Sequence, residues 1–226
     1  MSSVGIVGAG RLGLAVARLA VASGHRVLVA GSAGPARVGP VVASHAPGAA
    51  AATVTEAASA DLVVLAMPLT AYPTLPVAAL VGRTVLDATN YWWELDGLRP
   101  DLADPATSTS EIVQAHLAGA SVVKSLGHMS AADLEAEARP RGATGRKAVA
   151  VAGDDPAAVA QVVRFVDDLG FDPVVVGGLA EGIRFEPGTE IFGGDVDAAE
   201  LRALVARFPD SQRGRYLAKI RARGGR

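Results

Sequence analysis

The sequence has no cysteine, few aromatic residues and no long hydrophobic run. The absence of cysteine from 226 residues excludes disulfide bonds, thiolate metal sites and cysteine nucleophiles. No apolar stretch reaches the roughly 20 residues that span a bilayer. The N-terminus also lacks the basic segment and apolar run of a secretory signal. We therefore expect a soluble cytoplasmic protein that makes no membrane contact.

Several catalytic patterns are also missing. Nothing in the chain resembles a Ser-His-Asp triad, a nucleophile elbow or a P-loop lysine. His45, His116 and the carboxylates show no metal-ligand spacing, so we expect no metal site. His25 follows a glycine directly before a predicted strand and is interpreted as structural.

The charge is unevenly distributed along the chain. The formal net charge is -2, but the last 16 residues, 211–226, carry six Lys and Arg residues and no acid. The preceding body is therefore acidic, and only Tyr216 in the tail is aromatic, so nucleic-acid binding is not favoured. The tail is either a solvated, frayed end or an arm that contacts a partner subunit or an anionic ligand.

Apolar runs alternate with helix-like stretches, which predicts an α/β fold with a doubly wound, mostly parallel sheet and a short C-terminal helical extension. Residues 61–67 form an unalternating apolar run, typical of a strand buried on both faces. We predict one domain over residues 1–180 and a C-terminal extension with the basic tail over 181–226. The predicted strands are 4–7, 26–30, 49–54, 61–67, 83–88, 120–125, 147–152 and 173–176. The predicted helices are 12–23, 110–117, 156–169 and 197–208, and the predicted loops are 31–47, 91–105, 138–146 and 177–194.

A glycine-rich loop joins the first predicted strand to the first helix. Its sequence fits G-x-G-x-x-G, which in a strand–turn–helix context is the fingerprint of a dinucleotide-binding Rossmann domain. The first glycine permits a tight turn, the second lets backbone approach a pyrophosphate, and the third lets helix and sheet pack closely. The loop consists of Gly8, Ala9, Gly10, Arg11, Leu12 and Gly13.

The end of the second predicted strand indicates which dinucleotide is bound. An NAD-preferring site places an acid about 20 residues beyond the glycines, on the ribose 2′-hydroxyl. Here Gly31 and Ser32 take that place, and no acid follows until Glu56. Ser32 could bond a 2′-phosphate that Arg37 or Arg11 neutralises, so the sequence favours NADP(H). The alternative is that Ser32 is an ordinary turn residue.

The ligand of a doubly wound sheet lies beyond the carboxyl ends of its strands. After the fourth predicted strand, Ala66, Met67, Pro68 and Leu69 would border the ribose or nicotinamide. After the fifth, Asn90 could bond a carboxamide or a substrate carbonyl. Residues 91–93, Tyr-Trp-Trp, could stack on a flat ring or could instead fill the core or a dimer interface.

Lys124 and His128 follow the sixth predicted strand and are the best-placed polar groups for a substrate. His128 could act as a general acid near neutral pH, and both residues are candidate catalytic groups. The alternative for His128 is a purely structural role.

Taken together, these motifs resemble the NADPH-dependent reductases of coenzyme F420, a 5-deazaflavin. The resemblance covers roughly residues 3–180 and includes the glycine loop, the acid-free GS pair, and the segments VVLAMP, SEIVQ, VVKSLGHM and KAVAVAGDD. It implies direct hydride transfer between nicotinamide C4 and deazaflavin C5, which needs positioning rather than an acid or base. It also implies a homodimer that acts on a small-molecule acceptor.

Two features depart from that family. Members with a clear 2′-phosphate site often have an arginine after the GS pair, where this chain has Ala33. Archaeal-type members end in an apolar helix, where this chain has a basic tail. Three functions therefore stay open. They are an NADP(H)-dependent reductase of F420 or a flavin-like acceptor, an NADPH-dependent reductase of a small carbonyl or imine, and a non-catalytic NADP(H)-sensing regulator.

Overall fold

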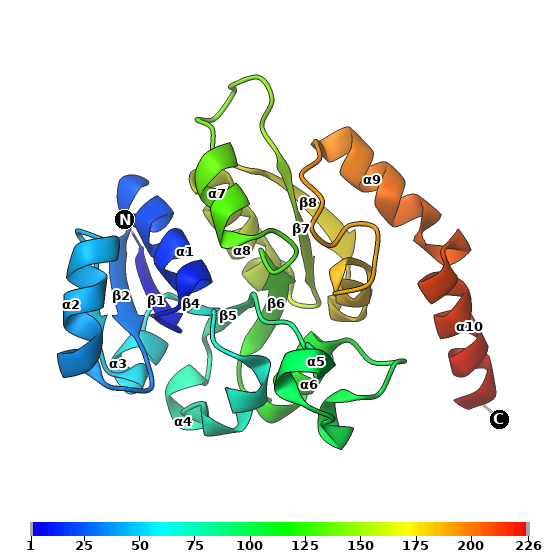
Figure 1. Cartoon of the computed structure of the whole chain (residues 1–226), viewed down its shortest axis with the longest axis horizontal. Helices are drawn as coiled ribbons and strands as arrows, with labels where there is room; N and C mark the ends of the chain where they lie inside the picture. Colours follow the sequence, from blue (N-terminus) through cyan, green and yellow to red (C-terminus); the bar gives the residue numbers. More distant parts are fainter. Residues whose placement is uncertain (1, 225–226) are drawn as a thin grey trace.

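The computed structural model describes residues 2–224 of the chain and contains an eight-stranded sheet (Figure 1). The strand order is β3-β2-β1-β4-β5-β6-β7-β8. All neighbouring strands are parallel except β6 and β7, which are antiparallel. The strands are β1 (Ser3–Val7), β2 (Arg26–Ala30), β3 (Ala50–Ala52), β4 (Leu62–Leu65), β5 (Thr84–Asp87), β6 (Ser121–Ser125), β7 (Ala148–Gly153) and β8 (Asp172–Gly177).

Helices cover both faces of the sheet because its central strands are apolar on both faces. Along β4, Leu62 and Val64 belong to one hydrophobic cluster, and Val63 and Leu65 belong to the other. The α-helices are α1 (Arg11–Ala22), α2 (Pro35–His45), α3 (Val54–Ala58), α4 (Val77–Leu80), α5 (Trp93–Asp96), α6 (Thr109–His116), α7 (Ala131–Glu137), α8 (Pro156–Asp168), α9 (Ala198–Arg207) and α10 (Gln212–Gly224). The 3₁₀-helices are η1 (Leu69–Thr74), η2 (Pro100–Leu102), η3 (Leu179–Phe185) and η4 (Phe208–Asp210).

The two clusters assign the helices to the two faces. Buried residues of α1, α2, α7 and α8 belong to the first cluster, and those of α3, α4 and α6 to the second. Helix α9 packs on β7 and β8 in a third cluster. No helix among residues 2–224 is long and apolar enough to cross a membrane.

The doubly wound, mostly parallel sheet is confirmed, and each predicted strand and helix is present with ends shifted by a few residues. The division at residue 180 stays a prediction. Three of the four predicted loops contain helices, so these predictions were wrong. Residues 31–47 contain α2, residues 91–105 contain α5 and η2, and residues 177–194 contain η3.

Helix α2 was missed because its apolar stripe is narrow. Val38 and Val42 are its two buried residues, four positions apart, and Gly39 and Pro40 lie between them. Pro35 at the first helical position fits the start of a helix, because proline lacks the N–H that would be unpaired there. A pattern with only one i, i+4 apolar pair does not distinguish a short helix from a loop.

The basic tail is helical rather than frayed as far as Gly224. Figure 1 shows α10 at the C-terminal end of the chain, next to α9. Leu217 is 6% exposed and belongs to a small cluster with Ile183 and Phe208, which ties the helix to η3 and η4. The last two residues of the tail, 225–226, lie outside the described residues.

Candidate functional site

The three glycines of the loop between β1 and α1 have different surroundings. Gly8 has φ +128°, and a Cβ on it would lie 2.3 Å from the carbonyl oxygen of Ala66. A Cβ on Gly13 would lie 1.9 Å from the carbonyl oxygen of Gly8, so Gly13 permits close packing of α1 on β1. A Cβ on Gly10 would meet nothing within 4 Å. Gly10 therefore leaves open space beside the loop, and its role in binding a pyrophosphate stays a prediction.

The N-terminus of α1 is suited to an anion. Gly10 is its N-cap, no side chain bonds the first turn, and that turn contains no acid. The unpaired N–H groups and the helix dipole together favour negative charge at this end. The loop and the helix start therefore fit a pyrophosphate.

Two cavities lie on either side of this helix start. Cavity A has a volume of about 620 Å³ and lies on the β2 side, and cavity B has a volume of about 670 Å³ and lies toward β5 and β6. The predicted residues that line cavity A are Gly8, Ala9, Gly10, Gly31, Ser32, Ala66, Met67 and Pro68. Those that line cavity B are Arg11, Leu12, Asn90 and His128.

Four predicted residues lie outside both linings. Gly13, Leu69 and Lys124 are buried in the interior. Arg37 is exposed in the first turn of α2. The structure thus brings most of the predicted cofactor-binding residues to one edge of the sheet, in two adjacent cavities.

Cavity A lacks a carboxylate at the position that would distinguish NAD from NADP. Among the described residues, its lining contains no Asp or Glu, and Ser32 is exposed at its wall. Arg11 lines cavity B instead, so Arg37 is the candidate cation on the side of Ser32. This arrangement fits a 2′-phosphate better than a free 2′-hydroxyl.

Asn90 and His128 line cavity B, and each has a buried polar atom that has no partner within residues 2–224. Asn90 donates from Nδ2 to the carbonyl of Gly127 at 2.7 Å, which leaves its Oδ1 buried and unpaired. Nε2 of His128 accepts from the N–H of Ala150 at 3.1 Å, so the hydrogen of the neutral ring is on the unpaired Nδ1. An unpaired acceptor and an unpaired donor on two residues that line the same cavity suit a ligand with an amide-type group, such as a carboxamide or a ring lactam.

Burial determines the charge of His128. Loss of solvation, together with the positive charge of Lys124, lowers the pKa of His128 to about 4. The imidazole is therefore neutral near pH 7, where it donates a hydrogen bond but holds no readily transferable proton. Its ring packs edge-on against Phe185 at 5.9 Å between centroids.

The turn that presents His128 is strained. Leu126 is fully buried and has φ +64°, a left-handed conformation that is unfavourable for a leucine. A Cβ on Gly127 would lie 2.9 Å from the carbonyl oxygen of Ala88, so β5 and this turn approach each other closely. The local geometry places Gly127 and His128 next to Asn90.

Lys124 lies beneath this turn and does not reach cavity B. Its Nζ contacts the carbonyl of Thr89 at 3.2 Å and the hydroxyls of Thr109 and Ser110 at 3.3 Å each. It also lies 4.0 Å from Oε1 of Glu186. The catalytic roles of Lys124 and His128 stay predictions, and these contacts favour a positioning role for Lys124.

Sequence reasoning missed two buried acids in this network. Asp87 accepts hydrogen bonds from the hydroxyls of Thr89 and Ser110 at 2.6 Å each. Glu186 accepts from the N–H and hydroxyl of Thr109 and from Arg213 of α10. An acid at the end of an apolar strand was a signal for Asp87. Glu186 follows η3 in a predicted loop, where no pattern distinguished it.

The three aromatic residues after β5 have different environments. The hydroxyl of Tyr91 donates to the carbonyl of Gly97 and accepts from the N–H of Arg99, so it holds its own loop. Trp92 lines cavity B and packs edge-on against Phe192 at 5.2 Å. Trp93 is 60% exposed. Trp92 is therefore the member of this group that is placed to contact a ring in cavity B.

Comparison with known proteins finds sequence similarity in the N-terminal part of the chain. Residues 3–91 match the sequence profile of the family described as "NADP oxidoreductase coenzyme F420-dependent". A segment of 81 residues is 43% identical to the protein YjhV of Escherichia coli (strain K12) and covers 36% of this chain. The matched segment spans 57% of that relative's length.

Two solved structures extend the similarity over most of the chain. The first is hypothetical protein SMa0349 from Sinorhizobium meliloti, 29% identical, with a TM-score of 0.76 and coverage of 87% of this chain and 95% of that one. The second is a proposed F420-dependent NADP reductase from Arthrobacter sp. FB24, 26% identical, with a TM-score of 0.65 and coverage of 79% and 85%. The family resemblance and the Rossmann architecture seen in the sequence are thereby confirmed.

Proposed function

We propose, since residues 3–91 belong to the F420-dependent NADP oxidoreductase family, that this protein transfers hydride between NADPH and a deazaflavin or flavin-like acceptor. The observation that carries the proposal is that Asn90 and His128, which line cavity B, each keep a buried polar atom, Oδ1 and Nδ1, without a partner within residues 2–224. The name of the Arthrobacter neighbour supports the same acceptor class.

The residues present fit NADP(H). The free N–H groups at the start of α1 would hold its pyrophosphate, and the space above Gly10 would admit it. Ser32 and Arg37 would hold the 2′-phosphate at cavity A. When bound, the nicotinamide supplies a hydride from C4 and leaves as NADP⁺.

Cavity B would hold the acceptor ring against the nicotinamide. Asn90 and His128 would bond an amide-type edge, and Trp92 and Phe192 would provide an apolar wall. The acceptor carbon gains the hydride, and water supplies the proton that the reduced ring takes up. The protein then contributes orientation rather than a proton, in agreement with the low pKa of His128.

The proposal is tested by mixing the protein with NADPH and F420 and following the deazaflavin absorbance. Wild-type protein is expected to turn over, and a His128→Ala variant is expected to keep most of kcat while KM for the acceptor rises. If the wild type reduces a small carbonyl or imine but not F420, and the variant loses that activity, a reaction that needs a proton donor replaces the proposal. Tight NADPH binding without turnover of any deazaflavin or flavin would contradict the proposal and favour a non-catalytic NADP(H)-sensing function.

A further inference from the structure

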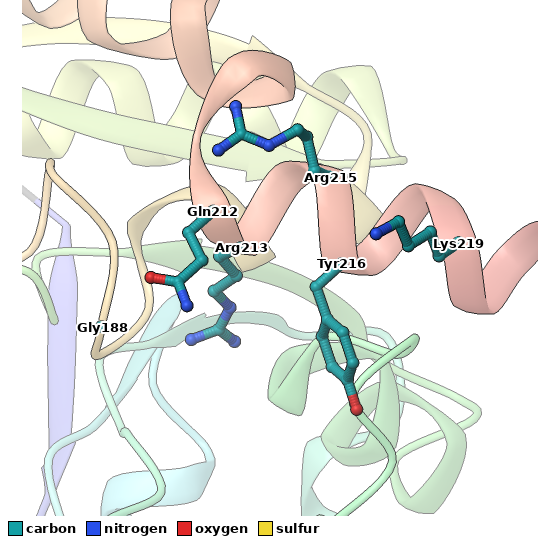
Figure 2. A pocket seen from close by; sticks show the side chains of 6 residues that line it. All are labelled: Gly188, Gln212, Arg213, Arg215, Tyr216 and Lys219. Carbon is teal, nitrogen blue, oxygen red and sulfur yellow. The ribbon is translucent and has the colours of Figure 1, made fainter.

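Arg213 of the basic helix α10 contacts a buried carboxylate. Arg213 and Arg215 both line a cavity of about 490 Å³ along this helix, and Figure 2 shows their side chains extending in different directions. Arg213 donates to Oε2 of Glu186 at 3.1 Å and to the carbonyl of Pro187. Arg215 donates to the carbonyl of Asp210, just before the helix begins. Arg213 therefore connects α10 to the interior of the protein.

Each carboxylate oxygen of Glu186 has its own partners. The side chain is 5% exposed, and its Oε2 accepts from Arg213. Oε1 accepts from the N–H of Thr109 at 2.7 Å and from its hydroxyl at 2.8 Å. The ammonium of Lys124 lies 4.0 Å from the same Oε1. Because a carboxylate is planar and rigid, the bond from Arg213 to Oε2 also determines where Oε1 meets Thr109 and Lys124.

Lys124 continues this network to the end of β5, where Asn90 follows. Its buried Nζ donates to the carbonyl of Thr89 at 3.2 Å. That carbonyl belongs to the peptide group that joins Thr89 to Asn90. Asp87 accepts from the N–H of Thr89 at 2.9 Å and from its hydroxyl at 2.6 Å. Side chains on both sides of Thr89 therefore fix the backbone that leads into Asn90.

The charges of this network are balanced. Its carboxylates are Asp87 and Glu186, and its cations are Lys124 and Arg213. Buried charges are tolerated where opposite charges and hydrogen bonds compensate their lost hydration. Without Arg213, the network would have a net negative charge, and Oε2 of Glu186 would have no partner within residues 2–224. Rearrangement of Glu186 would then change the contacts of Lys124.

We infer that Arg213 is a positioning residue that orients Asn90 in cavity B. It acts through two buried groups, Glu186 and Lys124, and itself lines neither cavity A nor cavity B. The inference rests on the proposed function, in which Asn90 bonds the acceptor ring. It gives the basic C-terminal helix a role in acceptor binding that needs no contact with the acceptor.

The first test observes Asn90 directly, because it is the only asparagine in the sequence. Protein labelled with ¹⁵N-asparagine gives one pair of side-chain amide signals in a two-dimensional NMR spectrum. Arg213→Gln should shift these signals, because it releases Glu186 and, through it, Lys124. Arg213→Lys keeps the charge beside Glu186 and should return the signals most of the way to their wild-type positions. Arg215→Gln removes a neighbouring cation of the same helix and should leave them unchanged.

The second test is steady-state kinetics with NADPH and 5-deazariboflavin. This acceptor is uncharged, so the loss of a positive charge does not by itself weaken its binding. We expect Arg213→Gln to raise KM for the acceptor about fivefold, with kcat and KM for NADPH unchanged. Arg213→Lys should restore KM, and Arg215→Gln should have no effect. A general loss of structure would instead reduce kcat with both KM values unchanged, and that result would overturn the inference.

The double variant Arg213→Gln/Glu186→Gln tests the route through Glu186. It should match Glu186→Gln alone in its Asn90 signals and in KM, because Arg213 acts through that carboxylate, and additive effects would contradict this route. Unchanged Asn90 signals in Arg213→Gln, an equal shift in Arg215→Gln, or a shift without a change in KM would overturn the inference and leave the proposed function standing. If the wild type reduces no deazaflavin or flavin, the proposed function fails, and the Asn90 signals alone then decide whether Arg213 orients this side chain.

Discussion

The ammonium of Lys124 lies 4.0 Å from Oε1 of Glu186, and the two side chains are only 1% and 5% exposed. They come from different parts of the chain, β6 and the segment after η3. A buried charge is tolerated where an opposite charge and hydrogen bonds compensate its lost hydration. Here Thr109 contacts both groups and completes that compensation.

Replacing one member of this pair should destabilise the fold. Lys124→Met leaves Glu186 with one compensating charge fewer, and we expect the free energy of unfolding to fall by about 3 kcal/mol. Denaturant titration measures the change. The double variant Lys124→Met/Glu186→Gln should lose less than the sum of the two single variants, because it removes both charges together. Strict additivity would show that the two groups do not interact.

The stability of the protein should depend on pH through His128. Its pKa is about 4 in the folded protein and about 6.5 when unfolded, so the unfolded state binds more protons between these values. Stability therefore falls as the pH falls from 6.5 toward 4, by about 2 kcal/mol between pH 8 and pH 5. Unfolding curves at several pH values measure this. A His128→Gln variant should lack this part of the pH dependence, and an unchanged dependence would contradict the assignment.

Two glycines of the loop should respond differently to alanine. Gly13→Ala should destabilise the protein by more than about 2 kcal/mol, because its Cβ would overlap the carbonyl of Gly8. Gly10→Ala should lower the melting temperature much less than Gly13→Ala, because its Cβ meets nothing within 4 Å and only the poorer N-cap preference of alanine acts against it. The same variant should weaken NADPH binding by filling space near the pyrophosphate. Calorimetry of NADPH binding and of thermal unfolding separates the two effects. Normal NADPH affinity of the Gly10→Ala variant would show that the pyrophosphate does not bind at Gly10.

Ser32 should determine the choice of dinucleotide. Ser32→Asp places a carboxylate beside the proposed 2′-phosphate, and we expect KM for NADPH to rise at least about tenfold, with little change for NADH. Ser32→Asn has nearly the same size without the charge and should cause a much smaller loss. Steady-state kinetics with both cofactors provide the measurement. Equal effects of the two variants on NADPH would indicate that charge at this position is unimportant.

The conformation of the glycine loop could be predicted from the sequence because it depends on a local pattern. Gly8, Gly10 and Gly13 have fixed spacing, and their roles follow from backbone sterics alone. The strands of the sheet could also be predicted, because most of them are continuous apolar runs that end at glycine, proline or polar residues. In contrast, α2 was missed because tertiary packing of two valines, rather than an extended apolar stripe, holds it to the sheet.

The environment of the candidate acceptor site depends on contacts between distant segments. The sequence placed His128 and Lys124 near the substrate, but their burial and the low pKa of His128 arise from packing against Phe185 and the strands around them. The left-handed conformation of Leu126 has no sequence signature, because leucine rarely adopts it. Glu186 accepts a hydrogen bond from Arg213, which lies 27 residues further along the chain, and no local sequence pattern indicates that contact.

The antiparallel pairing of β6 with β7 has a consequence for how this protein and its relatives can diverge. Because β7 and β8 run opposite to β6, β8 ends at the edge of the sheet where β6 begins. The segment after η3 then returns to the edge where β6 ends. There the N–H of Gly193 bonds the carbonyl of His128, and Phe192 packs on Trp92. Part of the wall of cavity B therefore comes from outside the matched segment 3–91. Changes in the segment after η3 can therefore reshape cavity B while the glycine loop stays unchanged.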